Sequence, residues 1–274
     1  MRFLSRRIGR LLLLFVSSLV SSLVLAEALP KELPKELSKE AVTLSWSKPA
    51  LERDYLGLQS SVVAAAADEL NSFISQSLVL TSPLSFIVTG ELEKYYAPEA
   101  REIHLPVSSV YQIVEGSQAK YPQQKEVQQE IISASLKHLL FSEFANALVQ
   151  EFSIAIVGWD RERIDGFALL SQLNSVRSEH LFILDAAEEY LLADRWRPVL
   201  DANQFTSEFA ADEFRYRQMV CLVEGFEAHH NFVEQQGSEA CIESYLREMD
   251  FWVAALKDHL GPKSLIRSWS EVPD

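Results

Sequence analysis

Ser142, Glu143 and Asn146 lie in an apolar segment, residues 141–152, at the spacing found in a zinc-binding helix. In a His-Glu-x-x-His helix the two histidines lie on one face, so both imidazoles can bind one Zn²⁺. The glutamate after the first histidine acts as general base on the zinc-bound water. This chain has the glutamate as Glu143, whereas Ser142 and Asn146 stand at the two histidine positions. The segment therefore has the proton acceptor but not the metal ligands.

A hydroxyl and a carboxamide are poor ligands for Zn²⁺, which prefers imidazole, thiolate and carboxylate. Losing two of four ligands costs on the order of 6–8 kcal/mol, or about four to six decades in affinity. We therefore expect Glu143 to be a vestigial general base, and we expect no zinc or other cofactor. Two alternatives stay open. One is a divergent hydrolase that uses Glu143 with unconventional zinc ligands, and the other is an ordinary amphipathic helix.

Other histidines could in principle supply the missing ligands. His138 lies one turn before Ser142, and His229 is followed directly by His230 in an expected polar loop over residues 227–237. Side chains of adjacent residues diverge in regular structure, and a lone histidine on a helix is more often solvated or structural. The sequence also has no Gly-x-Ser-x-Gly elbow and no Gly-rich phosphate loop.

The N-terminus has the pattern of a secretory signal peptide over residues 1–26. Four arginines precede an uncharged apolar run, Leu11–Leu25, and small residues follow at a cleavage site ending in Ala26. The run is shorter than the roughly 20 residues of a membrane span. We expect an exported protein, periplasmic or extracellular. The alternative is that the signal is not cleaved, and we expect the protein to contact a membrane only in that case.

Residues 27–45 contain a Leu-Pro-Lys-Glu repeat that cannot form a core, so they predict a solvated spacer. The formal net charge is −14, and it becomes −18 when residues 1–26, with four arginines and no acids, are removed. Such a chain is repelled by nucleic acid, so we expect no nucleic-acid partner. After export, Cys221 and Cys241 would form a disulfide; two buried thiols are the alternative.

The rest of the chain predicts a helix-rich α+β fold in a single domain, residues 46–274. A strand–turn–strand is expected over residues 78–89, and a short strand over Glu102–Leu105, which Pro106 limits to an edge or an end of a sheet. Helical periodicity predicts helices at residues 58–77, 127–152, 160–174, 180–194, 206–224 and 239–260.

The order of several blocks from about residue 85 to 262 resembles a family of exported bacterial proteins of unknown function that are predicted metallopeptidases. The blocks are Tyr95-Tyr-Ala-Pro-Glu-Ala-Arg-Glu-Ile-His-Leu105, Ser142-Glu-Phe-Ala-Asn-Ala-Leu148, Gly158-Trp-Asp-Arg-Glu-Arg-Ile-Asp165, Asp212–Gly225, Cys241 and Trp252. The resemblance implies a zincin-like domain in which a small sheet precedes a His-Glu-x-x-His helix. It also implies that residues 129–152 form the former active-site helix and that Glu102–Leu105 is an edge strand that a bound peptide could extend.

The chain departs from this family where the chemistry would take place. Both helix histidines are replaced, and Arg161 stands near the position expected for a carboxylate ligand, where it opposes cation binding. Asp160, Glu162 and Asp165 are left as weak acidic candidates for metal binding. The resemblance therefore implies a catalytically inactive relative that binds an unidentified peptide or protein, or that has a structural role.

Overall fold

The computed structural model describes residues 41–48, 50, 62–91, 93–156, 160–175, 180–194, 202–230 and 239–269. These residues belong to one compact unit, Lys39–Asp274. The expected signal peptide and most of the expected spacer lie outside the described residues. The first strand, β1 (Val42–Trp46), begins within the segment 27–45 that we expected to be spacer, so regular structure starts before residue 46.

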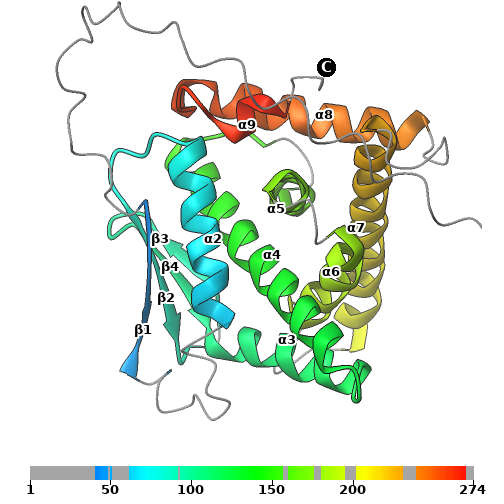
Figure 1. The fold of residues 1–274 in the computed structure, drawn as a ribbon. Helices are drawn as coiled ribbons and strands as arrows, with labels where there is room; N and C mark the ends of the chain where they lie inside the picture. The colour runs from blue at the N-terminus through cyan, green and yellow to red at the C-terminus, as the bar shows by residue number, and fades with distance from the viewer. Residues whose placement is uncertain are drawn as a thin grey trace, which may run out of the picture. The chain divides into compact units, whose positions relative to one another are not determined.

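A four-stranded mixed sheet forms the N-terminal side of the fold (Figure 1). Its strands are β1, β2 (Leu84–Thr89), β3 (Tyr95–Ala97) and β4 (Glu102–Pro106). In the order β1-β2-β4-β3, the first three strands run parallel and β3 is antiparallel to β4. With the many helices that follow, the sheet confirms the predicted α+β class.

The expectation that Glu102–Leu105 is an edge strand is wrong. Strand β4 is paired on both sides, with β2 and β3. The cause is a tight turn in which the Arg101 amide donates to the Pro98 carbonyl at 3.2 Å, with Arg101 at φ 55°. This turn folds Tyr95–Ala97 back onto β4, so β3 is the edge. Pro106 is the last residue of β4, so its missing N–H does not interrupt the hydrogen bonds between the strands.

The strand–turn–strand expected over residues 78–89 is also only partly present. One strand, β2, forms there, whereas Leu78 makes an isolated bridge with Leu260. Pro83 precedes β2, and it cannot donate a ladder hydrogen bond.

The described helices are α2 (Val62–Ser77), α3 (Val107–Lys120), α4 (Lys125–Glu151), α5 (Asp160–Ser175), α6 (His180–Asp194), α7 (Ala202–His229), α8 (Glu239–Leu256), the 3₁₀ turn η2 (Lys257–His259) and α9 (Leu265–Ser268). Six of them, α2 and α4 to α8, lie at the ranges that helical periodicity predicted, whereas α3 and α9 lie outside those ranges. Helix α7 is longer than expected, so His229 is helical and not part of a loop.

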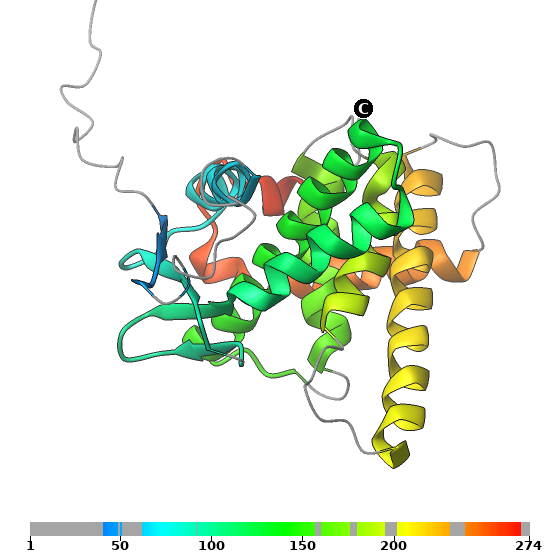
Figure 2. The ribbon, with the colours of Figure 1, turned by 90° about the horizontal axis from the view of Figure 1, so that it is seen from below.

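Helix α4 lies among the other elements and is packed by α2, α3, α5 and α6 (Figures 1 and 2). Its residues from Ile131 to Ala145 are buried with the exception of Ser133, because neighbours cover it on every side. The helix contains neither Gly nor Pro, so its backbone hydrogen bonds can run without a break. The polar side chains within this buried stretch are therefore held in the interior, Ser142 and Glu143 among them.

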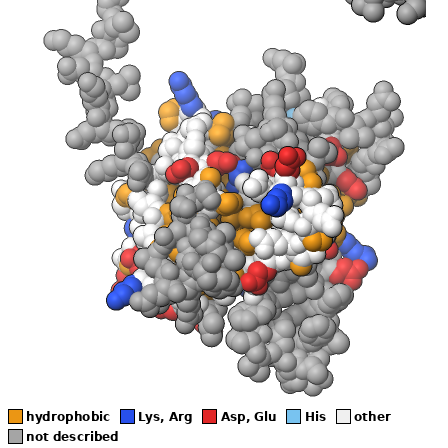
Figure 3. All heavy atoms as spheres, turned by 60° about the horizontal axis from the view of Figure 1, so that its bottom comes forward, with side chains coloured by type: hydrophobic (Ala, Val, Ile, Leu, Met, Phe, Trp, Pro, Cys, Tyr) orange, Lys and Arg blue, Asp and Glu red, His pale blue; other side chains and the backbone are white. Residues whose placement is uncertain are grey.

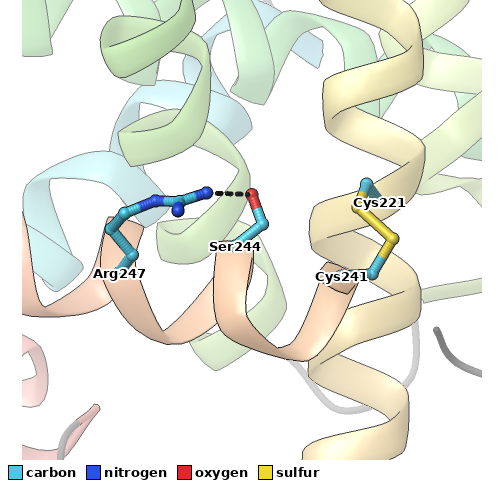
Figure 4. Close-up of a disulfide and its surroundings, with 4 residues drawn as sticks. All are labelled: Cys221, Cys241, Ser244 and Arg247. Carbon is cyan, nitrogen blue, oxygen red and sulfur yellow. Dashed lines mark hydrogen bonds between the residues drawn. A yellow bond between two sulfur atoms is a disulfide. The ribbon is translucent and has the colours of Figure 1, made fainter. Parts of the chain in front are cut away.

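Helices α7 and α8 are joined by the predicted disulfide, between Cys221 and Cys241 (Figure 4). Gly225 lies one turn along α7 from Cys221, and a Cβ atom there would stand 2.2 Å from the carbonyl oxygen of Cys241. Glycine at this position is therefore what allows the two helices to approach.

The face drawn in Figure 3 carries acidic and basic side chains interspersed around a hydrophobic area. None of the helices in the described part of the chain combines the length and the apolar character needed to cross a membrane.

Candidate functional site

A cavity of about 280 Å³ lies beside α4. Residues from the segment before β3 and from helices α4, α5, α6 and α7 line it: Lys94, Ser142, Glu143, Asn146, Arg161, Ile164, Asp165, Tyr190 and Arg215. The structure thus brings together Ser142, Glu143 and Asn146, which one face of a helix was expected to present, with the acidic candidate Asp165.

Glu143 is held by a lysine from another part of the chain. Lys94 Nζ lies 2.7 Å from Glu143 Oε1, and the two side chains are 17% and 9% exposed. Lys94 directly precedes β3, so the sheet positions the ammonium group and α4 positions the carboxylate. In this poorly solvated place the pair is stronger than an exposed ion pair, since less water screens it.

Asp165 is held in the same way by Arg215. Arg215 Nε donates to Asp165 Oδ2 at 2.7 Å, and Nη2 donates to Oδ1 at 3.0 Å. Both side chains are buried, and this two-point geometry is the strong form of an arginine–carboxylate contact. Arg215 Nη1 also donates to Asp212, at 3.4 Å. Both oxygens of Asp165 are therefore occupied by the guanidinium group.

Tyr190 of α6 orders the cations around the cavity. Lys94 Nζ lies 5.7 Å from the centroid of its ring and Arg215 Cζ lies 5.9 Å from it, which are distances for cation–π attraction. The ring also packs against His138, with centroids 4.6 Å apart. His138 is buried, and its Nδ1 lies 2.9 Å from Gln172 Nε2. His138 does not line the cavity, and its contacts are those of a core residue.

Of the two remaining acidic candidates, Glu162 and Asp160, the structure describes the side chain of Glu162. Glu162 does not line the cavity; burial, and next the charge of Asp165, raise the pKa of its carboxyl group. The side chain of Asp160 lies outside the described residues. Within the described part of the chain, no group of three or more His, Cys, Asp or Glu side chains could hold a metal ion. The described lining of the cavity offers two carboxylates and neither imidazole nor thiolate, which is not a donor set that suits zinc.

His229 is the last residue of α7, far along the helix from the cavity residue Arg215, and His230 follows it; their rings are 5.1 Å apart at 84°. Burial, and then the neighbouring His230, lower the pKa of His229. His230 Nδ1 lies 3.0 Å from the Phe226 carbonyl oxygen, and both rings pack near Tyr245. The pair does not line the cavity.

The sequence model of one protein family, DUF4344, described as "Putative metallopeptidase", matches residues 50–256. The chain belongs to this family. The match covers well over half of the chain, and it includes each residue that lines the cavity. No curated protein and no solved structure matches the chain.

Within this DUF4344 domain, sequence reasoning missed the two residues that decide the character of the cavity. Lys94 stands before a three-residue strand, and only the fold brings it to Glu143. Tyr190 is one of many apolar residues in α6, and no sequence pattern distinguishes it as a residue of the cavity. Arg215 could have been found, because it lies within the family-like block Asp212–Gly225 and a buried arginine is almost always paired with an acidic group.

Proposed function

We propose that this DUF4344 protein is an exported, zincin-like domain that has lost peptidase activity and binds a peptide or another protein beside α4. In this proposal Ser142 and Asn146 have replaced the two zinc-binding histidines of an active ancestor, and Glu143 is the remaining general base. No zinc or other cofactor takes part.

The ion pair of Lys94 with Glu143 carries the proposal. A general base needs an oxygen that can take a proton from water, and Glu143 Oε1 instead accepts a charge-assisted hydrogen bond at 2.7 Å. The ammonium group supplies a positive charge near the carboxylate, but it has no open coordination position at which water could be activated. These contacts support the loss of metallopeptidase chemistry, which needs a metal-bound water beside the glutamate.

The surroundings of this pair also oppose zinc. Three basic side chains and two acidic ones line the cavity in the described structure, a formal charge of +1. Such a lining repels a divalent cation, and Asp165, which could otherwise serve as a ligand, is bound to Arg215 through both oxygens.

The edge of the sheet supports peptide binding. Strand β3 has a partner on one side only in the described structure, and an extended peptide can add to such an edge through main-chain hydrogen bonds. Lys94 directly precedes β3, so a segment paired with this strand would pass close to the cavity. Tyr95, which is 40% exposed and stacks on His104 at 4.3 Å between ring centroids, offers an apolar surface there.

Export is supported by the sequence of residues 1–26 and by the disulfide between Cys221 and Cys241, since such bonds persist in oxidising compartments. The net charge of −14 supports a partner other than nucleic acid.

Metal analysis of the purified exported protein, after exposure to zinc and dialysis, tests the proposal together with mass spectrometry of a mixed peptide library. We expect far less than one zinc per chain and no cleavage products. The Glu143→Gln variant is the control, because any cleavage that it still shows comes from a contaminant. One tightly held zinc per chain, or cleavage that Glu143→Gln abolishes, would favour a divergent hydrolase instead.

A further inference from the structure

Ser142 places a buried hydroxyl group at the lining of the cavity. The residue is 1% exposed, and its Oγ has no hydrogen-bond partner among the described residues. Buried hydroxyls in proteins are normally hydrogen-bonded, because an unsatisfied one loses its bonds to water without compensation. A serine within a helix often donates to the carbonyl one turn earlier, and Ser142 does not. An acceptor atom in the cavity would satisfy it.

The charges around the cavity differ in sign from those of the whole chain. The chain has a net charge of −14, whereas the described lining carries +1. Asp212 and Glu162 add negative charge near Arg215, but neither of them lines the cavity. Of the three basic residues in the described lining, Arg161 is exposed to solvent, Lys94 is partly exposed and Arg215 is buried.

The polar groups that face the cavity are mostly donors. The carboxylates of Glu143 and Asp165 already accept from Lys94 and Arg215. The ammonium group of Lys94 donates to Glu143, and the hydroxyl of Ser142 has a proton to donate but no acceptor among the described residues. A group that only accepts, and that carries negative charge, fits this arrangement better than a neutral group or a cation.

We propose that this cavity binds the carboxylate group of a peptide ligand, which accepts a hydrogen bond from Ser142 and is attracted by the net positive charge of the described lining, Arg161 included. This inference rests on the proposed function, since it names the chemical group that a peptide would place beside α4. The carboxylate comes from the C-terminus of the peptide or from an acidic side chain. Ile164 and Tyr190 give the lining an apolar part that can contact the carbon chain behind it.

Two pairs of probes separate these sources. N-acetylalanine and its C-terminal amide differ only in the terminal carboxylate, and N-acetylglutamate α-amide and N-acetylglutamine amide differ only in a side-chain carboxylate. Each probe is titrated into the full exported protein and binding is followed by NMR. We expect at least one acid to bind about tenfold more tightly than its neutral partner, the effect of one charge-assisted hydrogen bond.

Ser142→Ala tests whether the cavity is the binding site. The variant removes one oxygen atom from a helix position that alanine suits, and we expect it to weaken binding of the preferred acid about fivefold. Ser171→Ala is the matched control: Ser171 is also buried in a helix, with a hydroxyl that has no partner among the described residues, but it does not line the cavity. This control should bind the acid as the unchanged protein does.

Arg161→Gln adds a test that carries little risk to folding, because the residue is exposed. We expect weaker binding of the acid and a smaller loss of binding when salt is added. Equal binding of acids and amides would overturn the inference, and so would an acid preference that Ser142→Ala leaves intact.

The failure of this inference can be told apart from that of the proposed function. Longer extended peptides with blocked termini and no acidic residues, titrated in parallel, report on peptide binding alone. If they bind while neither acid is preferred, peptide binding stands and carboxylate recognition fails. If no extended peptide binds while an acid is preferred in a Ser142-dependent way, carboxylate recognition stands and the peptide role fails.

Discussion

Lys94 Nζ and Glu143 Oε1 lie 2.7 Å apart, at a place where both side chains are largely shielded from water. Neither charge would be stable there alone, because removing an unpaired charge from water is costly. The lysine therefore makes a buried glutamate on α4 compatible with folding in the absence of a metal ion. The pair has a structural consequence that can be measured separately from any function.

Replacing Lys94 by methionine should destabilise the protein by about 3 kcal/mol, because Glu143 is then left without its counter-ion. The double variant Lys94→Met/Glu143→Gln should recover much of that loss. Urea unfolding of the two single variants and the double variant gives the coupling free energy. If the two single effects simply add, the ion pair does not link these residues in solution.

Replacing Asp165 by asparagine should cost about 3–5 kcal/mol of unfolding free energy, because Arg215 is buried and loses the charge that both of its hydrogen bonds require. Glu213→Gln is a suitable control on α7. It removes the partner of Arg217 in an exposed pair, and we expect a change below about 0.5 kcal/mol. Similar midpoints of urea unfolding for the two variants would contradict a strong buried interaction between Asp165 and Arg215.

Glu248 predicts a distinct pH dependence of stability. Burial raises the pKa of its carboxyl group from 4.5 to about 7, although Arg163 and the Trp252 indole N–H act in the other direction. The folded state then holds a proton that the unfolded state has released between about pH 4.5 and pH 7. The stability contributed by this group is therefore full below about pH 4.5 and is lost as the pH rises towards 7.

The variant Glu248→Gln lacks this titration. The unfolding free energy of the unchanged protein, minus that of the variant, should fall by about 3 kcal/mol between pH 4.5 and pH 7. Urea unfolding at several pH values across this range measures the difference. A constant difference would mean that Glu248 has the same pKa in both states.

Strong periodic patterns predicted much of the fold, and contacts between distant segments account for what was missed. The helix over residues 127–152 was predictable because apolar residues recur along its length, and α4 covers nearly the same range. Strand β3 has only three residues, and its position at the sheet edge depends on a turn at Arg101 with positive φ. No residue in Glu102–Leu105 could indicate that β3 would pair with this strand and make it an inner strand.

The residues of the candidate site also differ in whether a local pattern or a tertiary contact places them. Ser142, Glu143 and Asn146 come together through the spacing of a single helix, so the sequence was enough to place them on one side of it. Lys94 and Arg215 reach the same cavity from the sheet and from α7. Their contacts with Glu143 and Asp165 follow from tertiary packing, which no local pattern encodes.

The disulfide between Cys221 and Cys241 should stabilise the folded state by about 3 kcal/mol, because it closes a loop of 20 residues in the unfolded chain. Replacing both cysteines by serine removes this restraint. Urea unfolding under non-reducing conditions measures the loss, and the same experiment with a reducing agent should lower the unchanged protein to the level of the variant. No effect of the reducing agent would mean that the purified protein lacks the bond.

Gly225 should be sensitive to substitution in a way that depends on the same disulfide. An alanine Cβ there would stand 2.2 Å from the Cys241 carbonyl oxygen, so α7 and α8 must separate, at a cost of about 1–3 kcal/mol. The disulfide holds the two helices together at this point, so the cost of Gly225→Ala should be smaller in the double serine variant. Gly261→Ala is the control, since its nearest contact would be 3.7 Å away. Equal costs with and without the disulfide would show that the two helices do not need to move apart.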